Sequence, residues 1–194
     1  MELLDTLVVV EPIVKAFERV GVSYYVGGSV TSSIHGIPRS TMDIDLVADI
    51  RRKDVALLVN MLQTTYYIDR EMILEAIQRQ ASFNLIHLET MLKIDVFVLK
   101  GTPYAQEAFQ RRRKNLLDEE RNVELFLASP EDIILSKLDW FRMGGGVSER
   151  QWLGVMKVQR EWLDMDYLHH WASELALSDM LAQACRDAGL TSEE

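Results

Sequence analysis

Three aspartates interrupt segments of the chain that otherwise have the composition of buried β-strands. Asp43 and Asp45 alternate with apolar residues in the segment 42–48, and Asp95 does the same in the segment 92–99. Because side chains alternate between the two faces of a strand, each aspartate lies opposite the apolar face. Aspartate is an unfavourable residue in strands, so its repeated use at these positions indicates a function. The alternative is that all three are solvent-facing residues of half-exposed strands.

Two carboxylates on one strand face need a counter-charge. Asp43 and Asp45 stand about 7 Å apart along their strand and repel each other, which a divalent cation with hard oxygen ligands offsets. If the strand of Asp95 is a neighbour in the same sheet, three carboxylates converge. That number is enough to hold two Mg²⁺ ions, with water and a substrate phosphate completing the shells; Mn²⁺ is the alternative ion.

The turn Gly27-Gly28-Ser29 separates a predicted strand, 23–26, from a predicted short helix, 30–35. Glycines at a helix N-terminus let backbone N–H groups approach a phosphate closely, and the serine hydroxyl adds a donor. A tight strand-to-helix turn without a ligand is the alternative interpretation.

The remaining hydrophobic pattern predicts a mixed α/β (α+β) body at residues 1–128, followed by a helical region at 129–194. The other predicted strands are 83–88, 92–99 and 123–127. The other predicted helices are 3–20, 54–64, 71–80, 104–114, 130–142, 148–162, 166–174 and 178–188. Ser129 and Pro130 form a strong start signal for the first helix of the second region.

Taken together, Gly27-Gly28-Ser29, the stretch 39–46 (Arg-Ser-Thr-Met-Asp-Ile-Asp-Leu) and Ile94-Asp95-Val96 resemble the DNA polymerase β-type nucleotidyltransferase superfamily. The resemblance extends over roughly residues 20–140 and is closest to small bacterial members, among them AbiEii-type toxins of toxin–antitoxin and phage-defence systems. It implies a small mixed sheet flanked by helices. It also implies transfer of a nucleoside monophosphate from an NTP such as ATP to an acceptor hydroxyl, with release of pyrophosphate. The acceptor would be an RNA 3′ end, a protein or a small molecule.

The resemblance also implies roles for individual residues. Asp43 and Asp45 would bind both metal ions, and Asp95 would bind the catalytic one and help to deprotonate the acceptor. Gly28 and Ser29, in the turn with Gly27, would hold the triphosphate.

Two basic residues extend the predicted nucleotide site. Arg39 either anchors a phosphate through both guanidinium nitrogens or pairs with one of the aspartates. Lys137 stands on the inward side of the helix 130–142, where the resemblance implies a contact with the nucleotide phosphates. A lysine that snorkels from the edge of the apolar face is the alternative for Lys137.

The overall charge excludes a protein that coats nucleic acid. Thirty acidic residues against 21 lysines and arginines give a net charge of −9, most of it after residue 128. Two basic clusters, 51–53 and 111–114, are either solvated helix faces or phosphate-attracting patches that grip one end of an RNA.

The sequence further predicts a cytoplasmic protein without a membrane partner. Its longest N-terminal apolar run is cut by Glu11 and Pro12, too early for a membrane helix or a signal peptide. Cys185 is the single cysteine and cannot form an internal disulfide. All four tryptophans lie in the helical region, where a protein partner or a second copy of the chain would bind. A member of the fold that binds nucleotide or protein without catalysis is the alternative to an enzyme.

Overall fold

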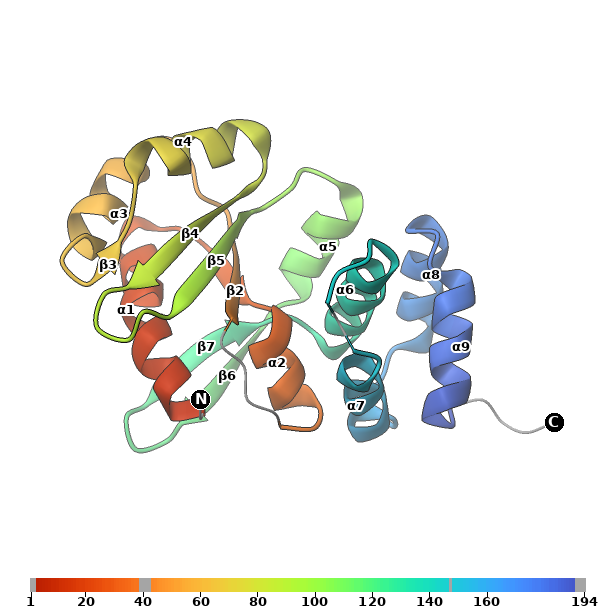
Figure 1. Ribbon diagram of the computed structural model, residues 1–194. Helices are drawn as coiled ribbons and strands as arrows, with labels where there is room; N and C mark the ends of the chain where they lie inside the picture. Colours follow the sequence, from red (N-terminus) through yellow and green to blue (C-terminus); the bar gives the residue numbers. More distant parts are fainter. Residues whose placement is uncertain (1–2, 39–42, 147, 191–194) are drawn as a thin grey trace. The chain divides into compact units, whose positions relative to one another are not determined.

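The computed structural model describes residues 3–38, 43–146 and 148–190. In this part of the chain the strands form one mixed seven-stranded sheet in the order β3-β4-β5-β2-β1-β7-β6 (Figure 1). Pairs β2·β5 and β1·β7 are parallel and the other pairs are antiparallel. The strands are β1 (Tyr24–Val26), β2 (Asp43–Ala48), β3 (Tyr66–Tyr67), β4 (Ser82–His87), β5 (Lys93–Val98), β6 (Arg113–Asp118) and β7 (Val123–Leu127). The predicted α/β fold with a small mixed sheet flanked by helices is confirmed.

The helices of the described residues alternate with the strands along the chain and continue after the last strand. They are α1 (Leu3–Val20), α2 (Gly28–His35), α3 (Val55–Leu62), α4 (Arg70–Arg79), α5 (Pro103–Arg111), α6 (Pro130–Arg142), α7 (Arg150–Gln159), α8 (Met165–Glu174) and α9 (Ser178–Ala188). The chain divides into two compact units. One comprises Met1–Val30 and Ser40–Leu127, and the other comprises Thr31–Arg39 and Ala128–Glu194.

In the first unit, α1, α3 and α4 cover one face of the sheet (Figure 1). Residues at alternate positions of β2, such as Ile44 and Leu46, are fully buried on that face. Phe17 of α1 packs against Tyr24 of β1, with ring centroids 6.1 Å apart. Burial of these apolar side chains is the main stabilising contribution in the unit and fixes which face of each strand points outward.

The second face of the same sheet has an apolar end and a polar end. Tyr25 is in register with Val47, and its ring centroid lies 5.7 Å from that of Phe109 on α5. The polar end lies where β1 finishes and β2 begins, at Asp43 and Asp45. Helix α5 therefore closes the apolar end of this face.

In the second unit, α2 ends against the C-terminal helices. A β-carbon at Gly36 would lie 2.7 Å from the Val155 backbone nitrogen, so only glycine permits this approach to α7. The Gln159 side-chain amide donates to the His35 carbonyl at 2.8 Å. The predicted division into 1–128 and 129–194 stays a prediction; its boundary lies one residue after the Leu127–Ala128 connection, and it does not set residues 31–39 apart.

Helix α6 begins as the sequence predicted. The Ser129 hydroxyl accepts from the Asp132 backbone N–H at 3.1 Å, and Pro130 occupies the first turn, where its missing N–H costs no hydrogen bond. Trp152 of α7 is buried against Phe141, with ring centroids 5.2 Å apart. Trp140 and Trp162, in contrast, are 51% and 80% exposed. Of the helices in the described part of the chain, none combines the length and apolar character that a membrane crossing requires.

Two strands of the sheet were not predicted. Helix α5 ends at Arg111 rather than at residue 114, because β6 begins at Arg113 and pairs with β7. Strand β3 is only two residues long and pairs with β4. Both are edge strands. Helix α2 also begins earlier than predicted, at Gly28, which places the Gly-Gly-Ser turn directly at its N-terminus.

Candidate active site

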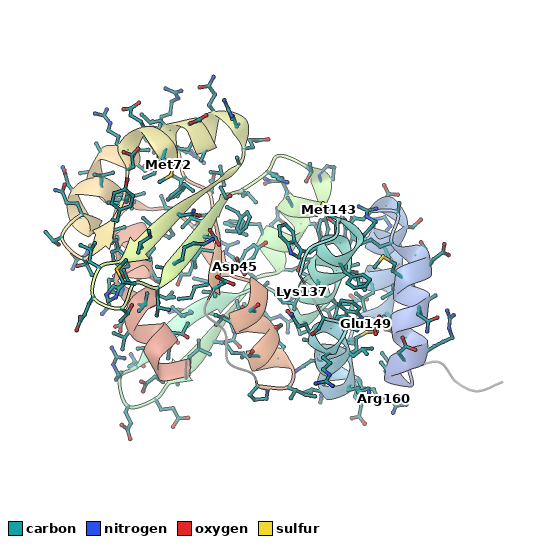
Figure 2. The ribbon with its side chains drawn as sticks, in the orientation of Figure 1. Asp45, Met72, Lys137, Met143, Glu149 and Arg160 are labelled. Atoms are coloured by element: carbon teal, nitrogen blue, oxygen red, sulfur yellow. The ribbon has the colours of Figure 1, made fainter. Side chains whose placement is uncertain are left out.

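The strand register brings the predicted catalytic aspartates onto one face. Strands β2 and β5 are parallel neighbours, and Asp45 is directly opposite Asp95. Asp43 precedes Asp45 by two residues and therefore shares its face. The carboxylate of Asp45 projects from the middle of the first unit (Figure 2). The condition on which the metal prediction depended, that the two strands are neighbours with Asp95 on the same side, is met by this register.

The Gly27-Gly28-Ser29 turn lies against the same carboxylate. The Gly27 N–H donates to the Asp45 carbonyl at 2.9 Å. Gly28 has φ +56°, in the left-handed region, and a β-carbon there would overlap the Asp45 carboxylate. Ser29 follows in the first turn of α2. The backbone of a helix N-terminus and a strand carboxylate thus form one continuous surface.

Lys93 is a member of this site that the sequence analysis missed. It is opposite Asp43 in the register, and its Nζ lies 2.9 Å from Asp95 Oδ2. The Lys93 side chain is 48% exposed and that of Asp95 is 18% exposed, so the ion pair borders solvent. The hydrogen bond to Asp95 raises the pKa of Lys93, and the negative charges of Asp95, Asp43 and Asp45 add to the effect. The sequence contains a signal for this residue, because Lys93 stands two residues before Asp95 in a predicted strand and therefore lies on the same face.

The donor set at this surface suits a hard divalent cation. All three candidate ligands are carboxylates, which Mg²⁺ and Mn²⁺ prefer, and Asp43 is exposed. Within the described residues, however, no group of three or more His, Cys, Asp or Glu side chains is arranged to hold a metal ion. The Lys93 ammonium lies beside Asp95 instead. The ligand chemistry fits the predicted metal, while the side chains stand in a different arrangement.

The two remaining predicted nucleotide ligands are Arg39 and Lys137. Arg39 lies outside the described residues. Lys137 belongs to α6 in the second unit and is buried, with 8% of its surface exposed (Figure 2). Lys137 is therefore not a solvated surface lysine. Its predicted contact with nucleotide phosphates stays a prediction.

The two basic clusters have structural partners. Arg51 pairs with Asp49 at 3.1 Å. The Arg112 guanidinium carbon lies 4.2 Å from the centroid of the Phe109 ring, and burial lowers the pKa of Arg112. Lys114 pairs with Glu124 on the neighbouring strand. These contacts give Arg51, Arg112 and Lys114 partners within the fold, and both interpretations of the clusters, as solvated helix faces or as phosphate-attracting patches, stay predictions.

The mixed sheet and the aspartates at its polar end define a protein of the nucleotidyltransferase superfamily. A family model described as nucleotidyltransferase of unknown function (DUF6036) matches residues 19–187, and the chain belongs to this family. No curated protein matches the sequence.

Solved structures confirm the fold. The solution structure of the antibiotic-resistance factor ANT(2'')-Ia has a TM-score of 0.59 at 14% identity, covering 93% of this chain and 98% of that one. An antigenic nucleotidyltransferase-like protein from Paracoccidioides brasiliensis has a TM-score of 0.52 at 14% identity, with coverages of 90% and 89%. A protein from Thermotoga maritima, proposed to be a nucleotidyltransferase, has a TM-score of 0.50 at 14% identity, with coverages of 90% and 96%.

Proposed function

We propose that the protein is a Mg²⁺-dependent nucleotidyltransferase that transfers a nucleoside monophosphate from an NTP to an acceptor hydroxyl. The observation that carries the proposal is the register of β2 and β5, which sets Asp45 opposite Asp95 on the face that Asp43 shares. The Gly28 backbone against the Asp45 carboxylate adds a phosphate-binding turn at the same place.

The reaction forms one bond and breaks one. The acceptor oxygen attacks the α-phosphorus, the bond from that phosphorus to the oxygen bridging to the β-phosphate breaks, and pyrophosphate leaves with the electron pair. The proton of the acceptor hydroxyl passes to the Asp95 carboxylate, directly or through water. Asp43, Asp45 and Asp95 would hold the divalent cations, which would lower the acceptor pKa and neutralise phosphate charge.

The residues of the chain then act mainly by positioning. Backbone N–H groups of the Gly27–Ser29 turn and the Ser29 hydroxyl would hold the triphosphate. Arg39 and Lys137 are proposed as further phosphate ligands. Their contribution is tested separately, because Arg39 lies outside the described residues and Lys137 belongs to the second unit.

The proposed acceptors are an RNA 3′ end, a protein hydroxyl or a small molecule. Modification of RNA or protein would suit a toxin of a toxin–antitoxin or phage-defence system. A small-molecule acceptor would parallel the antibiotic-resistance factor that shares the fold. Transfer to an acceptor panel distinguishes these classes.

The test measures label transfer and pyrophosphate release with each of the four α-labelled NTPs, in Mg²⁺ or Mn²⁺. Total RNA, cell-extract protein and an antibiotic panel serve as acceptors. We expect one acceptor class to be labelled by the wild type, and Asp43→Asn with Asp45→Asn to lower the rate by a factor on the order of a thousand or more.

Glu124→Gln is the matched control. Glu124 is an exposed strand carboxylate of the same sheet that pairs with Lys114, and it lies on β7. Its amide variant should keep full activity. No label transfer to any acceptor, combined with nucleotide binding that is indifferent to Mg²⁺, would show that the chain is the non-catalytic nucleotide- or protein-binding member of the fold.

A further inference from the structure

The most unusual group at the candidate site is a lysine among the metal-binding carboxylates. Lys93 is the first residue of β5, and it lies on the face shared by Asp43, Asp45 and Asp95. Its Nζ is 2.9 Å from Asp95 Oδ2, the carboxylate proposed above to bind the catalytic metal and receive the acceptor proton. The Lys93 side chain is 48% exposed, so it is not part of the buried core.

The charges explain why a cation is needed here when no metal is bound. Three carboxylates on one sheet face carry a formal charge of about −3 in neutral solution, and neighbours on one strand and across two strands repel each other. One ammonium at hydrogen-bond distance from Asp95 and across from Asp43 reduces that repulsion. A divalent cation bound to the same oxygens would do so more strongly, because it carries twice the charge.

The ammonium and the metal ion therefore compete. Lys93 Nζ, at 2.9 Å, occupies a lone pair of Asp95 Oδ2 and draws electron density from the carboxylate, which weakens it as a metal ligand. A metal ion a few ångströms from an ammonium is in addition repelled by it. Metal binding and the Lys93–Asp95 ion pair thus oppose each other at one carboxylate.

We propose that Lys93 is a built-in counter-ion that keeps the carboxylate site closed to divalent cations until a nucleotide arrives. A metal ion that enters together with a triphosphate is accompanied by the negative charge of the phosphates. This charge attracts the Lys93 ammonium and lets it leave Asp95. Lys93 is a positioning residue in this scheme, because it acts through Asp95. The inference rests on the proposed function, in that it takes Asp43, Asp45 and Asp95 as the metal ligands.

The scheme makes a prediction that ordinary stabilising ion pairs do not make. Removing a purely structural lysine would leave cation affinity unchanged or lower it. Removing a competing lysine raises the affinity of the free protein for divalent cations. We expect Lys93→Met to bind Mn²⁺ on the order of tenfold more tightly than the wild type in the absence of nucleotide.

The experiment titrates full-length protein with Mn²⁺, following free Mn²⁺ by electron paramagnetic resonance, without nucleotide. Lys100→Met is the matched control, since Lys100 is an exposed lysine just beyond the end of β5 and its loss changes the net charge equally. We expect Lys100→Met to bind as the wild type does. Lys93→Gln, which keeps a polar side chain, serves as a second variant, and thermal unfolding verifies that each variant is folded.

Asp45→Asn, alone and combined with Lys93→Met, separates the two proposals. Loss of Mn²⁺ binding in Asp45→Asn would show that the carboxylates bind the metal. If, in addition, Lys93→Met and Lys93→Gln bind Mn²⁺ as the wild type and Lys100→Met do, Lys93 does not compete with the metal, and the inference is overturned. Weaker binding by Lys93→Met would likewise overturn the inference, since Lys93 would then hold Asp95 in its ligating position. If Asp45→Asn leaves the Mn²⁺ affinity of both backgrounds unchanged, or if no protein binds Mn²⁺, the metal site itself is wrong.

Discussion

The backbone of Gly28 lies so close to the carboxylate of Asp45 that a β-carbon at residue 28 would overlap Asp45 Oδ2. This contact joins the turn at the start of α2 to the strand that carries two of the candidate metal ligands. Any side chain at residue 28 is therefore disfavoured for two separate reasons, the left-handed φ of +56° and the space that the Asp45 carboxylate fills.

Gly28→Ala should therefore destabilise the protein and displace the Asp45 carboxylate. We expect the free energy of unfolding to fall by about 1–2 kcal/mol from backbone strain and by about 1–3 kcal/mol more from overlap. Urea denaturation measures the sum. Because a displacement of about 1 Å at a reacting centre costs on the order of a hundredfold in rate, nucleotidyl transfer should fall by at least that factor.

Gly21→Ala is the control for the backbone effect. Gly21 has φ +74° and no atom within 4 Å of its would-be β-carbon, so this variant carries the strain without the overlap. Equal losses of stability in the two variants would mean that the Asp45 carboxylate moves aside at no cost.

A second prediction concerns stability in alkaline solution. Tyr66 is 1% exposed, its hydroxyl donates to the Val9 carbonyl at 2.7 Å, and burial raises the pKa of this phenol above its usual value of 10.0. The unfolded chain then loses the proton before the folded one does. The stability that Tyr66 contributes is complete below about pH 10 and declines as the pH rises toward the folded-state pKa, by up to about 1.4 kcal/mol per pH unit.

Tyr66→Phe should lower stability at neutral pH by about 1 kcal/mol and make the alkaline decline less steep by one proton. Denaturant titrations at several pH values from neutral to about 12 measure both effects. Tyr67→Phe, at the neighbouring and 56% exposed tyrosine, should leave the slope unchanged. Identical slopes in all three proteins would contradict the assignment.

A third prediction concerns the single cysteine. Cys185 on α9 is 5% exposed, and burial raises the pKa of its thiol above the usual value. Since the thiolate is the reactive form, the native protein should react with a thiol-specific disulfide reagent on the order of a hundredfold more slowly than the protein in concentrated guanidinium. Gln183→Cys combined with Cys185→Ser moves the thiol to an exposed position of the same helix and should restore fast labelling. Slow labelling there as well would attribute the protection to something other than burial.

A fourth prediction concerns the contact between α2 and α7. A β-carbon at Gly36 would meet backbone atoms of Gly154 and Val155 within 3 Å, and backbone cannot give way as a flexible side chain does. Gly36→Ala should lower the free energy of unfolding by about 1–3 kcal/mol. Gly101→Ala is the control because its β-carbon would meet only the Gln80 amide at 3.8 Å, and it should change stability by less than about 1 kcal/mol. A loss as small for Gly36→Ala would show that the two helices can separate freely.

The hydrophobic pattern predicted those elements that have one buried and one exposed face. Strand β2 alternates buried and exposed residues because one face packs on helices, and this alternation placed Asp43 and Asp45 correctly. The missed strands β3 and β6 lie at the two edges of the sheet. Strand β6 has no buried residue, so it lacks the alternation from which a strand is predicted, and its basic start extends the polar helix before it.

The candidate site also has features that the sequence pattern predicts and features that it does not. Register decides that Asp45 faces Asp95, and a sequence can state that only as a condition. The alternation already puts Lys93 and Asp95 on one face, but it does not say which charged side chains of that face form an ion pair. Contacts that depend on an exact approach, such as Gly28 against Asp45, have no signature in hydrophobic pattern.

Helix α2 is shared by the two compact units. It begins with Gly28 and Ser29 in the first unit, and its later residues, from Thr31 to His35, are counted with the second. Because the second unit takes residues 31–39 from between two segments of the first, no single cut of the chain separates the two units.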